Sequence, residues 1–296
     1  MKALRKLTMV LVGVVCLTAS MNVSADDLQD VLARGELRHL GIPYANFVTG
    51  AGDGLDVEIA QGFARHLGVK YRYFQTDFYS VMRDLLGQEV AHVGDRVTLS
   101  GDFPVKGDMI GAGFTILPWR EQVLLYSKST FPSQVLLIAP SGATIKPIHG
   151  SEDLSRDIAE TKALIGGRSL LVMHRTCLDP ANYGLNDKGL DLKAYTRSTN
   201  LNEMIPAMLA GAADLSLLDV PDVLLDLQKW NGQIKVIGPI SSEQTMGFAF
   251  RKSAPELRNA FNVYLNSIKA DGTYNSLVDR YYPGIRSYFP KFFSGK

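Results

Sequence analysis

Short runs of apolar and β-branched residues alternate in this chain with segments of helical periodicity. Residues 36–42 predict a strand, and residues 55–67 predict a helix because Ile59, Phe63 and Leu67 fall on one stripe. Strands separated by helices favour parallel α/β layers. Further strands are predicted at 69–74, 109–115, 123–127, 134–139, 169–174, 215–218, 234–237 and 246–251, and further helices at 202–209 and 255–269.

Composition sets the size of the core and excludes one class of partner. The chain has 296 residues, 46% of them hydrophobic, which is enough for one large or two small globular domains. The 31 basic residues almost balance the 30 acidic ones, for a formal net charge of +1. A nucleic-acid partner is therefore not expected, because such binding depends on a concentrated positive charge.

The first 25 residues are predicted to be a secretory signal peptide. Lys2, Arg5 and Lys6 are basic, residues 7–20 are apolar, and residues 23–25 form a small-residue cleavage site. The alternative is a transmembrane anchor, but the apolar run is shorter than the roughly 20 residues that span a bilayer. We therefore expect a secreted protein.

Cysteine and histidine usage predicts neither a disulfide nor a metal centre. Cys16 lies inside the predicted signal peptide, so only Cys177 remains, and we interpret it as a small buried residue rather than a nucleophile. The histidines have no metal-binding spacing, so we expect no structural zinc, and no cofactor is predicted. They are His39, His66, His92, His149 and His174.

Two charged residues follow predicted strands, where ligands bind in open α/β sheets. The Arg120 guanidinium has the shape to grip a carboxylate through two hydrogen bonds. Asp219 lies at the end of an apolar run, ahead of Pro221, and suits an ammonium group. Together they would complement a zwitterion. The spacing alone also allows a surface salt bridge for Arg120 and a helix-capping role for Asp219.

Five segments, taken in order, resemble one known family. They are LQDVLARGEL at 28–37, GLDVEIA at 54–60, the stretch 107–120 that ends at Arg120, GAAD with Asp219 and Pro221 at 211–221, and DGTYN at 271–275. In this respect the chain resembles the family 3 periplasmic solute-binding proteins, which serve polar amino acid ABC importers.

The resemblance implies a type II periplasmic-binding-protein fold. Such a fold has two α/β lobes, each a mainly parallel sheet flanked by helices, joined by two crossover strands that act as a hinge. The crossovers are expected near 128–133 and 241–246. Lobe one would then comprise residues 26–130 and 245–296, and lobe two residues 131–244.

The resemblance also implies roles for individual residues. Arg120 would bind the ligand carboxylate, with hydrogen bonds added by Thr115 and the backbone of Gly113, and Asp219 would bind the ligand ammonium group. Thr176 keeps the hydroxyl of a family loop that usually meets the carboxylate. The remaining implied ligand contacts are the aromatic residues Tyr44, Phe47 and Phe78, which are equally typical of an ordinary core.

Three departures from the family pattern bear on the ligand. Leu117 replaces a usual threonine, which makes the wall apolar there. Arg175 adds a charge to the loop at 174–177, so the ligand would carry a second anionic group if this side chain points inward, whereas an outward Arg175 would lie in water. Residues 90–106 are predicted to be an insertion that covers the mouth of the cleft.

By resemblance, the function is that of a periplasmic, monomeric receptor without enzymatic activity, which carries a small zwitterion such as an amino acid to a membrane ABC permease. One alternative is an enzyme of the cyclohexadienyl dehydratase type. Another is an accessory protein of a quinoprotein dehydrogenase, with residues 90–106 or the aromatic C-terminal segment 288–293 as the partner surface. Lytic transglycosylases that carry a similar receptor domain also have a catalytic domain. Because nothing follows Lys296, we expect a different kind of protein.

Overall fold

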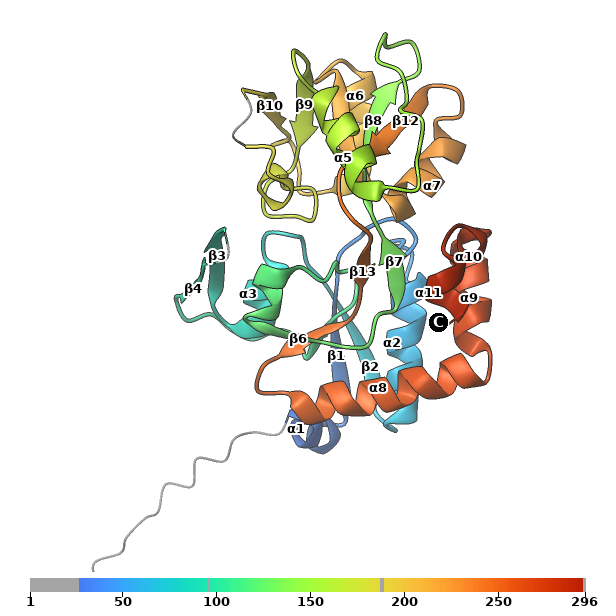
Figure 1. Cartoon of the computed structure of the whole chain (residues 1–296). Helices are drawn as coiled ribbons and strands as arrows, with labels where there is room; N and C mark the ends of the chain where they lie inside the picture. The colour runs from blue at the N-terminus through green and yellow to red at the C-terminus, as the bar shows by residue number, and fades with distance from the viewer. Residues whose placement is uncertain (1–26, 95, 187–188, 295–296) are drawn as a thin grey trace, which may run out of the picture.

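Two five-stranded sheets, one in each of two lobes, organise the chain (Figure 1). The structure is a computed structural model and describes residues 27–94, 96–186 and 189–294. The predicted signal peptide lies outside these residues. We refer to the part around the first sheet as lobe one and the part around the second as lobe two.

The sheet of lobe one has the strand order β2-β1-β5-β14-β6. Strands β1 and β2 pair in parallel, as do β1 and β5, whereas β14 runs antiparallel to both of its neighbours. Four strands therefore share one direction, in agreement with the mainly parallel sheet that was expected. The bounds are β1 (Glu36–Gly41), β2 (Lys70–Gln75), β5 (Met109–Ile110), β6 (Leu124–Tyr126) and β14 (Ala249–Arg251).

Helix α2 (Leu55–His66) packs on this sheet through the predicted stripe, with Ile59 and Phe63 fully buried. Gly54 precedes it with φ 133°, and a Cβ at this position would lie 2.2 Å from the carbonyl oxygen of Phe47. Only glycine fits there. The other helices of lobe one are α1 (Asp27–Arg34), α3 (Val81–Leu86), α4 (Pro118–Glu121), α8 (Pro255–Ala270), α9 (Thr273–Tyr281), α10 (Ile285–Tyr288) and α11 (Pro290–Ser294).

The sheet of lobe two has the order β10-β9-β11-β8-β12, and here β8 is the strand that runs against its neighbours. The strands are β8 (Val135–Pro140), β9 (Ser169–Val172), β10 (Asp191–Ala194), β11 (Leu215–Asp219) and β12 (Ile234–Pro239). The helices are α5 (Leu154–Ala163), α6 (Met204–Leu209) and α7 (Val220–Lys229), with short 3₁₀ turns η1 (Pro180–Tyr183) and η2 (Leu201–Glu203).

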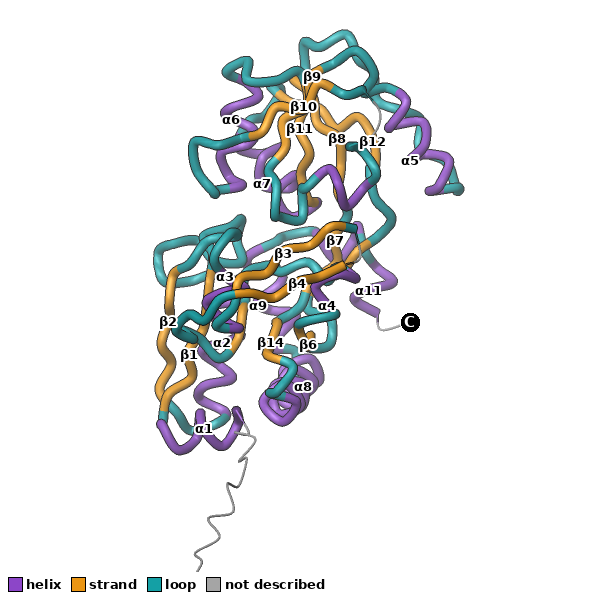
Figure 2. Tube along the Cα trace, turned by 90° about the vertical axis from the view of Figure 1, so that its left-hand side faces the viewer, coloured by secondary structure: helices purple, strands orange, loops and turns teal. Residues whose placement is uncertain are grey.

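Two short strands join the lobes. Strands β7 (Phe131–Ser133) and β13 (Gln244–Met246) pair antiparallel, with Phe131 opposite Met246. Figure 1 shows both strands between the lobes, and Figure 2 shows β7 there from a second side. They lie in the two segments where crossovers were expected. The lobe boundaries given above stay a prediction.

A hairpin occupies the segment that was predicted to be an insertion. Strands β3 (Glu89–Val93) and β4 (Arg96–Ser100) pair antiparallel and form a separate two-stranded sheet. In Figure 1 the hairpin projects from lobe one toward the loops of lobe two. The sequence analysis had assigned no strands here.

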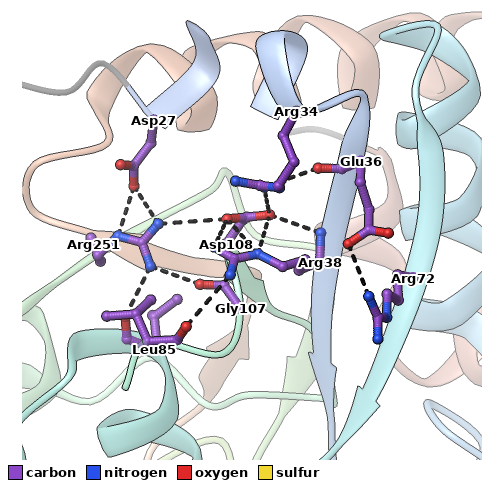
Figure 3. A network of polar contacts seen from close by, with 10 residues as sticks. Asp27, Arg34, Glu36, Arg38, Arg72, Leu85, Gly107, Asp108 and Arg251 are labelled. Carbon is purple, nitrogen blue, oxygen red and sulfur yellow. Dashed lines mark hydrogen bonds and ion pairs between the residues drawn. The ribbon is translucent and has the colours of Figure 1, made fainter. Parts of the chain in front are cut away.

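A network of ion pairs around one buried carboxylate connects α1 with the sheet of lobe one (Figure 3). Asp108 is 1% exposed and lies beside β5. Its carboxylate contacts the guanidinium groups of Arg34, Arg38 and Arg251, and Arg251 also pairs with Asp27 of α1 at 2.7 Å. This network therefore connects the first helix with β1 and β14.

The element boundaries differ from the predicted ones mainly at the lobe junction. The strand predicted at 246–251 is divided between β13 and β14, because the chain changes from the crossover pair to the sheet of lobe one. Strand β5 has two residues where seven were expected, because the chain leaves the sheet after Ile110 and Thr115 forms a bridge with Met246 of β13. The aromatic residues of the C-terminal segment differ in burial. Phe293 packs against Phe131 and Tyr274, whereas Tyr288 is 71% exposed.

None of the helices in the described ranges has the length and hydrophobicity required to cross a membrane.

Candidate ligand site between the lobes

Arg120 is the charged residue that α4 places in the interior of lobe one. Leu117 is extended and Pro118 stands at the start of α4, which is a favourable position for proline. The Arg120 side chain is 2% exposed, and its Nη1 donates to the carbonyl oxygen of Thr115 at 3.0 Å. The guanidinium carbon lies 4.0 Å from the centre of the Phe114 ring. Arg120 is therefore buried against a carbonyl and a ring, which excludes the surface salt bridge that was considered as an alternative.

Asp219 is the last residue of β11 and is completely buried. It stands at the N-cap position of α7, yet its side chain makes no capping hydrogen bond. Its Oδ2 accepts hydrogen bonds from the Tyr44 hydroxyl at 3.1 Å and from the Cys177 thiol at 2.9 Å. The capping alternative is thus excluded, and the carboxylate faces lobe one instead.

The contact between Tyr44 and Asp219 joins the two lobes. Tyr44 follows β1 of lobe one, and Asp219 ends β11 of lobe two. Close by, the backbone N–H of Ala45 donates to the side-chain oxygen of Asn202 at 3.1 Å. Arg120 and Asp219 belong to different lobes, and the guanidinium stabilises the carboxylate electrostatically. The structure therefore brings the two predicted anchors into one interlobe region.

Several polar atoms in this region are buried and lack a hydrogen-bond partner. They include Nε of Arg120, Oγ1 of Thr115 and Oδ1 of Asp219. Buried polar groups are nearly always paired, so an unpaired group needs an explanation. One donor on the guanidinium, one acceptor on the carboxylate and one hydroxyl are the groups that a zwitterionic ligand would engage.

Burial also controls protonation here. Desolvation raises the pKa of Asp219, although hydrogen bonds from Cys177 and Tyr44 and the charge of Arg120 oppose this effect. Burial, with the neighbouring charges of Asp226 and Asp219, raises the pKa of Asp222 well above its ordinary value. Burial therefore favours the protonated form of both carboxyl groups when no ligand is bound, and an ammonium group beside them would favour the ionised form.

The predicted aromatic contacts form one cluster. The Tyr44 ring lies 6.0 Å from Phe47 in a stacked arrangement and 5.6 Å from Phe78, which meets it edge-on. Phe47 also packs against Phe131 and Tyr282, each at 5.1 Å, so it is part of the core. Tyr44 contacts Asp219 directly, and Phe78 packs against Tyr44.

The other predicted contacts use their polar groups within the protein. The N–H of Gly113 donates to the Asp56 carboxylate at 2.7 Å, with φ 59° at the glycine. The Thr176 hydroxyl donates to the carbonyl oxygen of Met173 at 2.7 Å and accepts from the N–H of Leu178 at 3.0 Å. A ligand would compete with these bonds.

Arg175 extends across the cleft to lobe one. Its Nη2 lies 3.3 Å from the carbonyl oxygen of Tyr79 and 3.4 Å from the Glu89 carboxylate in β3. The side chain is half exposed, and the residue has a positive φ of 62°. The side chain lines a cavity between the lobes and pairs with Glu89, while about half of it remains exposed, so it combines features of the inward and outward alternatives.

The comparisons with known proteins identify the family and the fold. Residues 105–284, more than half of the chain, match the model of the bacterial extracellular solute-binding proteins, family 3. This chain belongs to that family. The match confirms the resemblance noted in the sequence, and the two lobes confirm the fold class.

Solved structures of other proteins show the same fold. A mutant of ArgBP from T. maritima has a TM-score of 0.68 and 21% identity, covering 86% of this chain and 99% of that one. The ancestral amino acid-binding protein AncCDT-1, a precursor of cyclohexadienyl dehydratase, has a TM-score of 0.65 and 21% identity over 87% of this chain and all of that one. The GluR0 ligand-binding core from Nostoc punctiforme, in complex with L-glutamate, has a TM-score of 0.63 and 18% identity, covering 83% and 99%.

A curated relative shares only part of its length with this chain. The membrane-bound lytic murein transglycosylase F of Desulfosudis oleivorans is 27% identical over 183 residues. This region is 62% of the present chain and 37% of the transglycosylase. The chain therefore spans little more than a third of that relative's length.

Sequence reasoning missed two participants in the site. Cys177 was predicted to be a small buried residue, and it is buried, but its thiol also donates to Asp219. Burial raises the pKa of Cys177 well above its ordinary value, so the thiol stays protonated. Ser133 of β7 is the second: its side chain lowers the pKa of Asp219, and its buried hydroxyl lacks a hydrogen-bond partner among the described residues. The position of Ser133 in a predicted crossover was the one available signal.

Proposed function

We propose that this protein is a periplasmic receptor that binds an amino acid, or a similar small zwitterion, between its lobes and delivers it to an ABC importer. The observation that carries this proposal is the burial of Arg120 and Asp219, from different lobes, with unpaired atoms on both. Family membership and the amino acid-binding neighbours support it. The proposed roles are carboxylate binding by Arg120 and Thr115, and ammonium binding by Asp219.

Binding of an ammonium group requires a change at Tyr44. The Tyr44 hydroxyl occupies Oδ2 of Asp219, and this contact bridges the lobes. We propose that the lobes open at β7 and β13, that the ligand replaces the hydroxyl, and that closure then buries the ligand. A ligand that contacts both lobes shifts the equilibrium toward the closed form.

Titration calorimetry of the purified chain with the common amino acids tests the proposal. At least one should bind, and Arg120→Ala should weaken that binding at least about 100-fold, because two charge-assisted hydrogen bonds are lost. Arg286→Ala is the matched control, since its guanidinium is 42% exposed and pairs only with Asp279 in the described structure. Equal affinity in the two variants would refute the assigned role of Arg120.

Two further outcomes distinguish the alternatives. Turnover of prephenate or arogenate by the purified protein would establish an enzyme and contradict the receptor role. A thermal melt in which none of the amino acids stabilises the protein would favour an accessory role, because a ligand at 100 times its Kd stabilises by about 2.7 kcal/mol.

Localisation and delivery are part of the same proposal. The predicted signal peptide and the extracellular solute-binding family support a periplasmic location. Cell fractionation should recover the protein in the periplasmic extract as a monomer, and cross-linking in cells should trap it on a membrane permease.

A further inference from the structure

A cavity of about 700 Å³ lies between the lobes, and Trp119, the neighbour of Arg120 in the sequence, is one of its lining residues. Its walls come from both lobes: Phe78 and Met82 near α3, His92 in the hairpin, Trp119 in α4, and Arg175 in the loop after β9. The volume falls within the range of roughly 300 to 1,000 Å³ that is usual for small-molecule sites. We refer to this space as the outer chamber.

The outer chamber shares two aromatic walls with the candidate site. Phe78 lines the chamber and meets the ring of Tyr44, whose hydroxyl binds Asp219. Trp119 lines the chamber and precedes Arg120, whose guanidinium lies 5.2 Å from the centre of the indole ring. A ligand held by Arg120 and Asp219 would therefore extend its side chain past these rings.

The hairpin completes the chamber. The His92 ring of β3 stacks on Trp119, with the ring centres 4.0 Å apart and the planes 9° from parallel. At the base of the same strand, Glu89 pairs with Arg83 of lobe one at 2.8 Å and with Arg175 of lobe two at 3.4 Å. The hairpin thus contributes both a ring wall and the partner of an interlobe contact.

The charged groups around the chamber are already compensated. Arg83 and Arg175 share Glu89, and Asp179 accepts from the N–H of Arg175 and lies 3.5 Å from the His174 ring. A charged ligand side chain would have to break one of these contacts. An aromatic side chain would leave them intact and exchange water for contact with rings.

We propose that the outer chamber binds the side chain of an aromatic amino acid, with His92 as a residue that determines this specificity. This inference rests on the proposed function, since Arg120 and Asp219 would hold the backbone groups of the same ligand. The hairpin then acts as a third wall of the binding site.

Titration calorimetry with tryptophan, phenylalanine, alanine, arginine and glutamate tests this proposal. Tryptophan or phenylalanine should bind at least tenfold more tightly than the other three. His92→Ala should weaken aromatic binding about tenfold and leave alanine binding unchanged. Leu99→Ala is the control, because this residue on the other strand of the hairpin is 42% exposed and lies outside the lining of the chamber.

Fluorescence supplies a second measurement that needs no substitution in the hairpin. The sequence has two tryptophans, so Trp230→Phe leaves Trp119 as the reporter. Binding of phenylalanine should shift or quench its emission, whereas binding of alanine should do so far less.

The outcomes separate this inference from the proposed function. Tighter binding of arginine, glutamate or alanine, or unchanged aromatic binding by His92→Ala, would overturn the aromatic specificity and leave the receptor role standing. Absence of binding by every amino acid would overturn the receptor role, and the inference with it.

Discussion

Asp108 and Asp219 are both buried aspartates beside a sheet, yet their surroundings differ completely. Asp108 has three guanidinium groups around it (Figure 3): Arg34 Nη2 donates to Oδ2 at 2.5 Å, Arg38 Nη2 donates to Oδ1 at 2.7 Å, and Arg251 is 3.7 Å away. The backbone N–H of Arg38 donates to Oδ2 as well. Both oxygens of this carboxylate are occupied.

Asp219 has only neutral donors, a hydroxyl and a thiol, on one of its oxygens, and the other oxygen is unpaired. A buried carboxylate that is fully paired holds a fold together, whereas one with unmet hydrogen-bonding capacity is suited to an external ligand. The comparison therefore separates a structural network from a binding site within one molecule.

The largest effect on stability is expected when the network around Asp108 loses its carboxylate charge. Asp108→Asn should lower the free energy of unfolding by about 3 to 5 kcal/mol, because removal of one partner leaves buried charges uncompensated. Urea denaturation measures this loss. The affinity of the folded protein for its ligand should stay within twofold. A loss below 1 kcal/mol would mean that solvent already screens the three guanidinium groups.

At the binding site we expect a large loss of ligand affinity and no loss of stability. Asp219→Asn should weaken ligand binding by about 10- to 150-fold, which corresponds to the 1.5 to 3 kcal/mol of one charge-assisted hydrogen bond. The free energy of unfolding should stay the same or rise, since the variant no longer buries a poorly compensated carboxylate. Asp279→Asn, at an exposed position, is the control. A large loss of stability with unchanged ligand affinity would contradict the assignment of Asp219 to the binding site.

A third buried carboxylate, Asp56, extends the comparison to the pH dependence of stability. Burial raises its pKa from 3.8 to about 7, against the hydrogen bond from the N–H of Gly113. Between pH 4 and pH 7 the folded state keeps this proton and the unfolded state loses it. The contribution of Asp56 to the free energy of unfolding therefore falls as the pH rises, by up to about 1.4 kcal/mol per pH unit.

Asp56→Asn should remove this cost, so its free energy of unfolding should rise relative to the unmutated protein as the pH increases from 4 to 7. The comparison between the two proteins is needed because His39 acts in the opposite direction. Burial lowers the pKa of His39 to about 4, so stability is lost as the pH falls from 6.5 to 4. Denaturant titrations across this range measure the difference. Parallel pH profiles would contradict the raised pKa of Asp56.

The smallest effect is expected at the half-exposed contact between the lobes. Arg175→Ala should change ligand affinity by less than about fivefold, because surface ion pairs contribute roughly 0.2 to 1 kcal/mol. Calorimetry at low and high salt should show the difference shrinking as salt screens the pair. A larger, salt-independent loss would instead place Arg175 on the ligand.

Much of the architecture could be predicted from local patterns. The stripe of α2 and the apolar runs of β1, β8 and β11 carry their own periodicity, so these elements were predicted within one or two residues. The short strand β10 and the hairpin were missed, because their residues are mostly exposed and lack the apolar signal.

The alternation of strands and helices follows from the residue pattern, and so does the expectation that Arg120 and Asp219 come after strands. Their partners depend on contacts between distant segments. Tyr44 meets Asp219 from 175 positions away, and Arg251 joins Asp108 from the far end of the chain. The physical reason is that such contacts depend on how the sheets and lobes pack together, and no local spacing encodes that packing.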